Sequence, residues 1–534
     1  MYLWRQAKQE GSDTGMKKIL PYFLLLLMIV SFASVNVYAE DEIVYKTVEA
    51  DRFPKTYTKT VAEEYAASGA LRSVKALRSS PAKSNEVLFA ERIVEGWQNF
   101  AEEIDVSGLG IDFELAKNIY PRVFYENPRL YYVVGDFGYL DNSGKTFIYP
   151  RYIDSLYVDP YADDPVIDRT KIPEVYETLA AIDEETENIL FHINGNMSDF
   201  DKVMTVHDYI ALNYEYDGTY TVYDTSMMVN KSGVCQAYVL TMKLIMDRLG
   251  IDCTFVSSAA MNHAWNLVKI DGEWYHMDCT WDDPRPNVYA QVCHTYALLS
   301  TDCIENLPNA HSGFDLGDAV ADSYLYDNAD WHEAVNALVY SYGEQYRISG
   351  TSLVTVSGRT IMTRLDGGDN RWNISQRYFY SNACYAGIAE YNGKIYFNTD
   401  KAIWSYDTET EETRLEYNVP YICGLFINKN TLNYGVYSFD TNSIVQGGSF
   451  DLGDVRFGET YIENGNTVTK VCTENGAEVN IFQAKKNNGK LTDFRGLQIT
   501  ENGIATASFP KNGAVKLFFW DGNFKPYKDA LNFN

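Results

Sequence analysis

The sequence has few basic residues for its length. Across 534 residues, 45 Lys and Arg stand against 73 Asp and Glu, which gives a formal charge of −28. A surface so rich in negative charge repels nucleic acid and anionic lipid. The composition therefore argues against a nucleic-acid partner, and the acidity suits solubility outside the cell.

Long apolar runs are also scarce. The one such run, residues 19–32, is shorter than the roughly 20 residues that a membrane-spanning helix needs. It follows the basic start Met16–Lys18 and precedes Val37–Ala39, which ends in the small-residue pattern cut by signal peptidase. We expect residues 1–39 to be a secretory signal peptide, with residues 1–15 upstream of the true start. The mature protein is expected to be secreted or held at the cell surface, with no integral membrane segment.

Motifs for nucleotides and metals are missing as well. Ser143–Thr146 ends like a phosphate-binding loop, but the first glycine would have to stand at Tyr139, so a hairpin turn is expected instead. Asp282 and Asp283 lack the spaced ligands of a calcium loop, and the seven histidines show no zinc-site spacing. The sequence predicts no metal and no cofactor.

What the sequence does contain is a cysteine at the expected start of a buried helix. Tyr238–Leu249 is mostly apolar, Gly250 stands where a helix would end, and Cys235 lies at the beginning of this segment. The first N–H groups of a helix are unpaired and its dipole is positive there, so a thiolate is favoured. The pattern predicts a nucleophile, against the alternative of a structural buried cysteine.

A histidine and an aspartate follow on a predicted hairpin. Residues 262–270 and 273–280 alternate like strands around the two-residue turn Asp271–Gly272. The register places His263 and Asp278 diagonally on one face of the sheet, about 7 to 8 Å apart at the backbone, which the two side chains can bridge. The carboxylate would fix the imidazole tautomer while the other ring nitrogen takes the thiol proton.

The remaining histidines and cysteines are less informative. His207 and His294 lack an acidic partner at a helpful spacing and are expected to be structural, whereas His276 would line the cleft or pack beneath it. With Cys235 assigned to catalysis, seven of the eight cysteines remain, so at least one other is free. Cys293 and Cys303 are close enough in sequence to pair, but spacing alone does not decide this.

Several segments resemble the transglutaminase-like superfamily, whose core shares with papain a helix-borne cysteine packed on an antiparallel sheet. The resemblance extends over about residues 85–315 and is typical of secreted bacterial multidomain members. It implies Cys235 as nucleophile, His263 as general base and Asp278 as the partner of the histidine. The segments that carry it are Glu126–Tyr132, Ser232–Tyr238, Asn262–Asn266, Gly272–Asp283 and His294–Ser300.

Two positions depart from the family pattern. Cys279 follows the aspartate where relatives commonly carry proline or a small apolar residue, and Val229 stands where papain-type enzymes carry the glutamine of the oxyanion hole. One donor to the oxyanion would be the Cys235 backbone N–H. Tyr214 or Tyr216 is the candidate for the other.

The chain is longer than one hydrophobic core usually supports, so several domains are expected. The fold class predicted is α+β, a papain- and transglutaminase-like core with a helix-borne cysteine on an antiparallel sheet, followed by all-β C-terminal modules. We expect a signal peptide (1–39), a polar linker (40–84), an N-terminal α/β unit (85–165), the core (166–320), a β-rich domain of incomplete propeller-like repeats (331–447) and an Ig-like β-sandwich accessory module (448–534).

The function expected is that of a secreted thiol acyl-transfer enzyme. It would act on protein or peptide carboxamide or amide bonds through a thioester at Cys235. The alternatives are a cysteine peptidase or amidase of the same fold, including one that recognises cell-wall peptides, and a catalytically inactive surface binding or adhesion protein.

Overall fold

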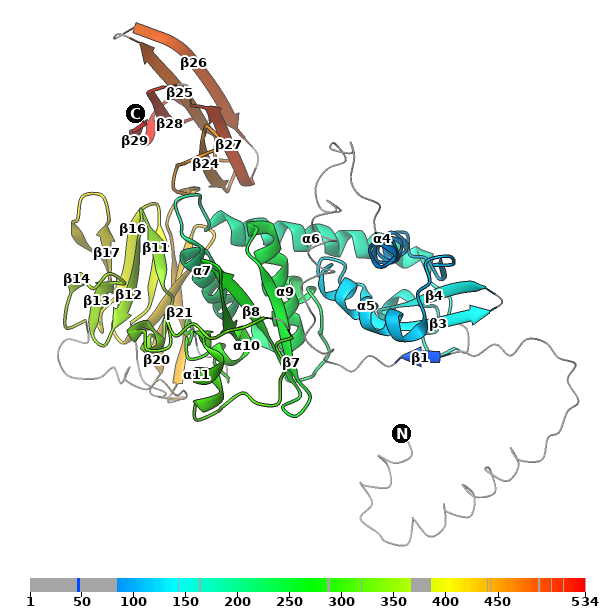
Figure 1. Cartoon of the computed structure of the whole chain (residues 1–534). Helices are drawn as coiled ribbons and strands as arrows, with labels where there is room; N and C mark the ends of the chain where they lie inside the picture. The colour runs from blue at the N-terminus through cyan, green and yellow to red at the C-terminus, as the bar shows by residue number, and fades with distance from the viewer. Residues whose placement is uncertain are drawn as a thin grey trace, which may run out of the picture.

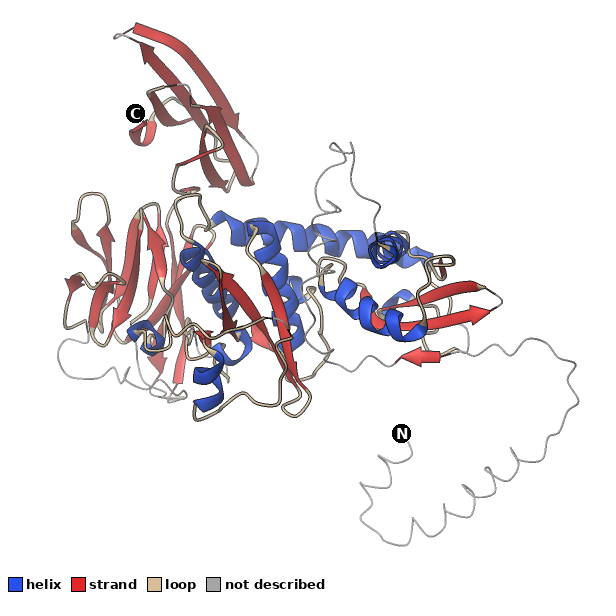
Figure 2. Ribbon diagram, in the orientation of Figure 1, coloured by secondary structure: helices blue, strands red, loops and turns tan. Residues whose placement is uncertain are grey.

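The computed structural model describes residues 46–48 and 84–533, apart from 143, 163–164, 286–288, 318, 366–385, 439, 442, 488–489, 501 and 512. The predicted signal peptide and most of the predicted linker lie outside the described residues. Helices are confined to the first part of the described chain, and the last part is built from strands alone (Figure 2). This arrangement is the predicted α+β class with all-β modules after the core.

The N-terminal unit is a four-stranded antiparallel sheet with two helices. Ser84 caps one helix through Val87 N, and Asp112 caps the other through Leu115 N. The strand order is β1-β3-β4-β2, so the sheet includes a strand from the segment predicted to be a linker. Its elements are β1 (Lys46–Val48), α4 (Asn85–Gln98), β2 (Ile104–Asp105), α5 (Phe113–Tyr125), β3 (Val133–Asn142) and β4 (Lys145–Tyr152), followed by the short turns η1 (Asp154–Leu156) and η2 (Arg169–Lys171).

The core consists of a helical layer packed on the antiparallel sheet β10-β9-β8-β7 (Figure 1). Helix α9 lies against β7 and β8, and its mostly apolar residues are buried there. The elements are α6 (Ile172–Phe191), α7 (Asp199–Asn213), β5 (Glu215–Tyr216), α8 (Met227–Asn230), β6 (Ser232–Gly233), α9 (Cys235–Leu249), β7 (Cys253–Ser258), β8 (His263–Ile270), β9 (Glu273–Met277), α10 (Cys279–Asp282), β10 (Ala297–Leu299) and α11 (Thr301–Asn306).

The N-terminal unit and this core share one hydrophobic interior. A single cluster of buried side chains runs from α4 and α5 through α9 and β8. At the junction the rings of Tyr125 and Phe255 stack with centroids 4.0 Å apart. The two parts therefore support each other through one apolar interior.

Three antiparallel sheets follow the core, each formed by strands consecutive in sequence. Their orders are β11-β12-β13-β14, β15-β16-β17-β18 and β19-β20-β21. The elements are η3 (Asp330–Glu333), β11 (Val339–Ser341), β12 (Glu344–Ser349), β13 (Ser352–Thr355), β14 (Thr360–Met362), β15 (Ile388–Tyr391), β16 (Lys394–Asn398), β17 (Ala402–Asp407), β18 (Thr413–Asn418), β19 (Ile422–Asn428), β20 (Thr431–Ser438) and β21 (Ser443–Asp451).

The last strands form two sheets that pack face to face over a common apolar layer, in which residues from both sheets are buried together. This sandwich projects away from the other parts of the chain (Figure 1). One sheet contains β22 (Val455–Phe457), β23 (Tyr461–Glu463), β24 (Asn466–Thr473) and β27 (Gly503–Pro510), and the other contains β25 (Val479–Asn487), β26 (Lys490–Ile499), β28 (Val515–Asp521) and β29 (Pro526–Phe533).

Two further observations concern the described residues as a whole. Among them, no helix combines the length and the apolar character required to cross a membrane. No two of the seven cysteines that the structure describes, Cys293 and Cys303 included, are joined by a disulfide.

Candidate active site

Cys235 is the first residue of α9, as the sequence predicted. It is 5 % exposed. The preceding residue pair, β6, runs parallel to β5, which anchors the turn into the helix. Gly233 is required in this turn, because a Cβ there would lie 2.6 Å from Met227 Sδ and 2.7 Å from Ala237 Cβ. The thiol is therefore held where the free N–H groups of a helix start stabilise negative charge.

His263 and Asp278 meet on the hairpin formed by β8 and β9. The hairpin has the predicted register, with Ile270 opposite Glu273 and Asn266 opposite Met277. His263 Nε2 lies 2.7 Å from Asp278 Oδ2. Interaction with the thiol of Cys235 also raises the pKa of the ring. Because Nε2 is bonded to Asp278, the nitrogen that remains for the thiol is Nδ1.

The backbone at Asp278 differs from the expected strand. Strand β9 ends at Met277, and Asp278 turns away with φ −115° and ψ 83° to cap α10. Its Oδ1 accepts hydrogen bonds from Thr280 N at 3.0 Å and Trp281 N at 3.1 Å. The expectation that the second strand of the hairpin continues to residue 280 is therefore wrong. One carboxylate both caps a helix and binds the histidine.

The two groups shift each other's ionisation in opposite directions. Burial opposes charge on His263, but the charge of Asp278, its hydrogen bond and the hydrogen bond with Cys235 outweigh burial and raise the pKa of His263 to about 9. Burial likewise opposes charge on Asp278, but the charge on His263 and the hydrogen bonds from His263 and His311 hold its pKa well below the usual range. The pair thus favours an imidazolium beside a carboxylate.

Aromatic rings enclose the imidazole. Trp265 stacks on one side of His263 with centroids 5.7 Å apart and planes 20° apart, and Trp281 stacks with centroids 5.2 Å apart and planes 28° apart. Such faces exclude water from the ring and stabilise a cation over their π systems. Nothing in the local sequence pattern predicts this contact of Trp281.

The structure also places a second histidine on the carboxylate, one that was not predicted from the sequence. His311 Nε2 lies 2.8 Å from Asp278 Oδ2, and the His311 side chain is fully buried. His311 comes after α11, in a loop separated from Asp278 by 33 positions. No local spacing could have indicated this contact, because it depends on the path of the chain through β10 and α11.

The two candidate oxyanion donors are in different situations. Tyr214 is buried and donates its hydroxyl hydrogen to Glu185 Oε1 at 3.0 Å. That hydrogen is therefore not available to an oxyanion. Tyr216 is half-buried, and burial together with the charge of the nearby Cys235 raises its pKa to about 12. Arg285 lies over its ring at 4.7 Å from the centroid. Of the two candidates, Tyr216 is therefore the one whose hydroxyl responds to charge on the thiol.

The other histidines of the core are bonded within it. His276 accepts a hydrogen bond from Trp265 Nε1 at 2.9 Å, and burial lowers its pKa to about 3, so it packs beneath the sheet. The expectation that His207 and His294 lack an acidic partner is wrong. Both bind Asp208 Oδ1 at 2.8 Å, and His207 also lies 3.2 Å from Asp282 Oδ2.

Two buried trios bring possible metal ligands within 4.8 Å of one another. They are His263 with Asp278 and His311, and His207 with Asp208 and His294. In each trio the nitrogen and oxygen atoms already hydrogen-bond one another. Neither trio needs an ion to satisfy these atoms.

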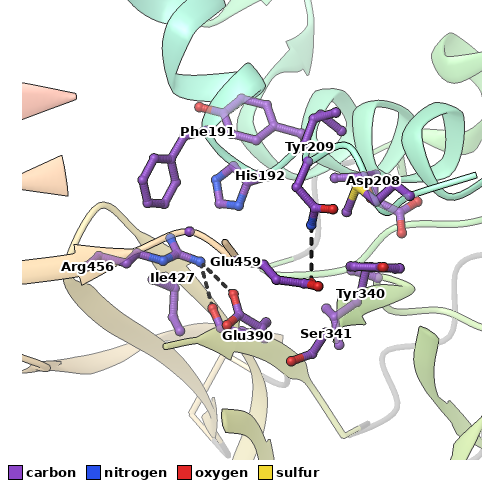
Figure 3. Close-up of a pocket in the computed structure, with 18 of the residues that line it drawn as sticks. Phe191, His192, Asp208, Tyr209, Tyr340, Ser341, Glu390, Ile427, Arg456 and Glu459 are labelled. Carbon is purple, nitrogen blue, oxygen red and sulfur yellow. Dashed lines mark hydrogen bonds and ion pairs between the residues drawn. The ribbon is translucent and has the colours of Figure 1, made fainter. Parts of the chain in front are cut away.

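A separate cavity of about 140 Å³ lies between the core and the β sheets (Figure 3). Arg456 donates to Glu390 in its wall, and Glu459 accepts amide hydrogen bonds from Asn194 and Asn196. Lys470 donates to the carbonyl of Ile193 at 2.8 Å. The charged groups in the cavity wall therefore link the core to the β sheets. The wall does not include Cys235, His263 or Asp278.

Residues 188–279 match the family model described as the Transglutaminase-like superfamily. The matched segment contains Cys235, His263 and Asp278. This part of the protein is therefore a transglutaminase-like core. None of the curated proteins compared with the chain matches it.

Among solved structures, the chain is similar to a TGase at 17% identity, with 27% of this chain and 43% of that chain covered and a TM-score of 0.19. It is also similar to a protein from Cytophaga hutchinsonii assigned as a cysteine protease, at 17% identity, 28% and 62% coverage and a TM-score of 0.17. An extracellular domain from B. thetaiotaomicron assigned to a hybrid two-component system shares 10% identity over 52% of this chain and 42% of that chain, with a TM-score of 0.19. The chain thus spans less than two thirds of the length of each.

Proposed function

We propose that the protein is a secreted thiol enzyme that transfers the acyl group of a protein or peptide amide through a thioester. The observation that carries the proposal is the hydrogen bond of His263 to Asp278, with the thiol of Cys235 acting on the same imidazole, within the segment that matches the family. In this set a nucleophile stands at a helix start, and a base is oriented by a buried carboxylate.

The proposed reaction starts with transfer of the Cys235 proton to His263 Nδ1. The sulfur attacks the carbonyl carbon, and the carbonyl electron pair moves onto oxygen. As the C–N bond breaks, the imidazolium returns its proton to the departing nitrogen, so ammonia or an amine leaves and a thioester remains. Attack by an amine completes acyl transfer, whereas attack by water completes hydrolysis, the outcome for a peptidase or amidase.

The test is incorporation of a labelled primary amine into a glutamine-containing acceptor protein, followed with purified wild-type protein and Cys235→Ala. Because no other group forms the thioester, Cys235→Ala is expected to abolish incorporation. Cys303→Ala removes a partly exposed thiol elsewhere in the core and is expected to retain it. Product fragments without label would assign hydrolysis instead, and label that persists in Cys235→Ala would refute the proposal.

Tyr216→Phe is expected to lower kcat by roughly 100-fold with little change in KM, since an oxyanion donor acts mainly in the transition state. The matched control is Tyr214→Phe, because Tyr214 donates to Glu185 rather than toward the thiol. That variant is expected to lose stability and to keep its kcat. Steady-state kinetics of both variants with the same acceptor check this, and equal kcat for wild type and Tyr216→Phe would remove Tyr216 from the oxyanion hole.

A further inference from the structure

Asp278 has all of its hydrogen-bonding capacity occupied by four donors. Two backbone N–H groups bind Oδ1, and two imidazole nitrogens, those of His263 and His311, bind Oδ2 at 2.7 and 2.8 Å. The carboxylate is fully buried. A carboxylate held on both oxygens cannot rotate, so its direction toward His263 is fixed by His311 as well as by the helix cap.

The ring of His311 is itself held by aromatic contacts. Its centroid lies 4.6 Å from that of Trp265, 4.4 Å from Trp281 and 5.2 Å from Tyr296. Its backbone N donates to Ile304 O at 3.1 Å, which fixes the loop after α11. Its Nδ1 has no hydrogen-bond partner among the described residues, so Asp278 is the polar group that its side chain binds.

We infer that His311 is a positioning residue for the proposed reaction, acting through Asp278 on His263. The inference rests on the proposed function and goes beyond it, because it assigns a fourth residue to the chemistry. Donation from His311 Nε2–H shares the charge of Oδ2 between two rings. It therefore limits how strongly Asp278 holds the proton on His263, and keeps the imidazole aligned for the thiol.

The ionisable groups around this unit are few. Asp278 and Cys235 face His263, and His276 lies behind the sheet with its pKa lowered to about 3, mainly by burial. Trp265 and Trp281 stack on His263, and both also contact the ring of His311. Substitution of His311 should therefore affect His263 through Asp278 and not by placing a new charge near the imidazole.

The test is the rate of alkylation of Cys235 by iodoacetamide between pH 4 and 10, followed by mass spectrometry of the peptide that contains it. A thiolate beside an imidazolium gives a plateau whose upper end marks loss of the imidazolium proton. His311→Leu is expected to slow alkylation on the plateau about tenfold. It should also move the upper end of the plateau up by roughly half a pH unit, since Asp278 then binds the imidazolium alone.

His311→Gln keeps an N–H donor near the position of Nε2 and is expected to restore the wild-type end of the plateau. His332→Leu is the control, because His332 is a buried histidine whose ring nitrogens bind the carbonyls of His294 and Tyr326 instead of Asp278. It should leave both ends of the plateau unchanged. A merely structural role for His311 would reduce the amount of folded protein and leave the plateau where it is, which would overturn the inference.

Should His311→Leu fail to fold, histidine-labelled wild-type protein gives a second measurement. The Nε2 protons of His263 and His311 should both give downfield, slowly exchanging NMR signals, and absence of the His311 signal would overturn the inference. The two proposals fail in different ways. A wild type without a plateau refutes the thiol mechanism, whereas a wild-type plateau that His311→Leu does not move refutes only the role of His311.

Discussion

Asp278→Asn is expected to lower kcat by about 10⁴-fold with little change in KM. The carboxylate accepts four hydrogen bonds, two on each oxygen. An amide has one oxygen, so its NH₂ group must face either the two backbone N–H groups of the α10 cap or the two imidazole N–H groups. Either arrangement places donors against donors, and His263 loses the partner that fixes its tautomer.

The measurement is steady-state amine incorporation by Asp278→Asn beside Asp283→Asn. Asp283 accepts a hydrogen bond from Tyr238, and burial raises the pKa of Asp283 to about 8, so its side chain is mostly uncharged at pH 7. An amide there should change kcat less than tenfold, although the substitution is chemically the same. A similar loss in the two variants would show that the effect comes from the local fold and would contradict the assigned role of Asp278.

The second large effect is expected in stability. Asp208→Ala should lower the free energy of unfolding by about 3–5 kcal/mol, because removing one member of a buried charged network leaves its partners unpaired. Asp208 accepts from His207 and His294 at 2.8 Å each, and from Leu338 N at 2.5 Å. Urea unfolding at pH 6 measures the loss. Asp252→Ala is the control, since its exposed ion pair with Lys269 at 3.6 Å should contribute about 1 kcal/mol or less.

The same network predicts a dependence of stability on pH. Burial opposes charge on His207, but hydrogen bonds to Asp208 and Asp282 and their charges raise its pKa to about 9 from 6.5. A raised histidine pKa adds stability that is complete below pH 6.5 and is lost as the pH rises through 9. The wild type should therefore lose stability between these values, and Asp208→Ala should lose less. Equal slopes of the free energy of unfolding against pH in the wild type and Asp208→Ala would contradict the assignment of this pH dependence to His207.

The features that the sequence predicted correctly are local ones. The start of α9 follows from an apolar segment with glycine at its end, and the register of β8 with β9 follows from a two-residue turn. Both depend on residues within one hairpin or one helix. The close contact of His263 with Asp278 could be predicted for the same reason. The turn of the backbone at Asp278 into α10 could not.

The missed features are those that depend on distant parts of the chain. His311 reaches Asp278 across 33 positions, and His207 reaches Asp282 across 75. Adjacent residues of a helix usually point in different directions, so the sequence gives no sign that His207 binds Asp208. Strand β1 pairs with β3 from a segment whose polar composition resembles a linker. Composition and periodicity describe single elements, and these contacts arise only when elements are packed together.

Asp208 connects two parts of the chain that the expected boundaries separate. Leu338 N donates to its carboxylate, and His294 Nδ1 lies 3.1 Å from Ala334 O. A fragment that stopped at residue 320 would retain Cys235 and His263. It would, however, remove Leu338 N from the carboxylate of Asp208 and the carbonyl of Ala334 from His294. Recombinant pieces intended to work as an autonomous enzyme should therefore extend past Leu338, into the first strand of the β sheets.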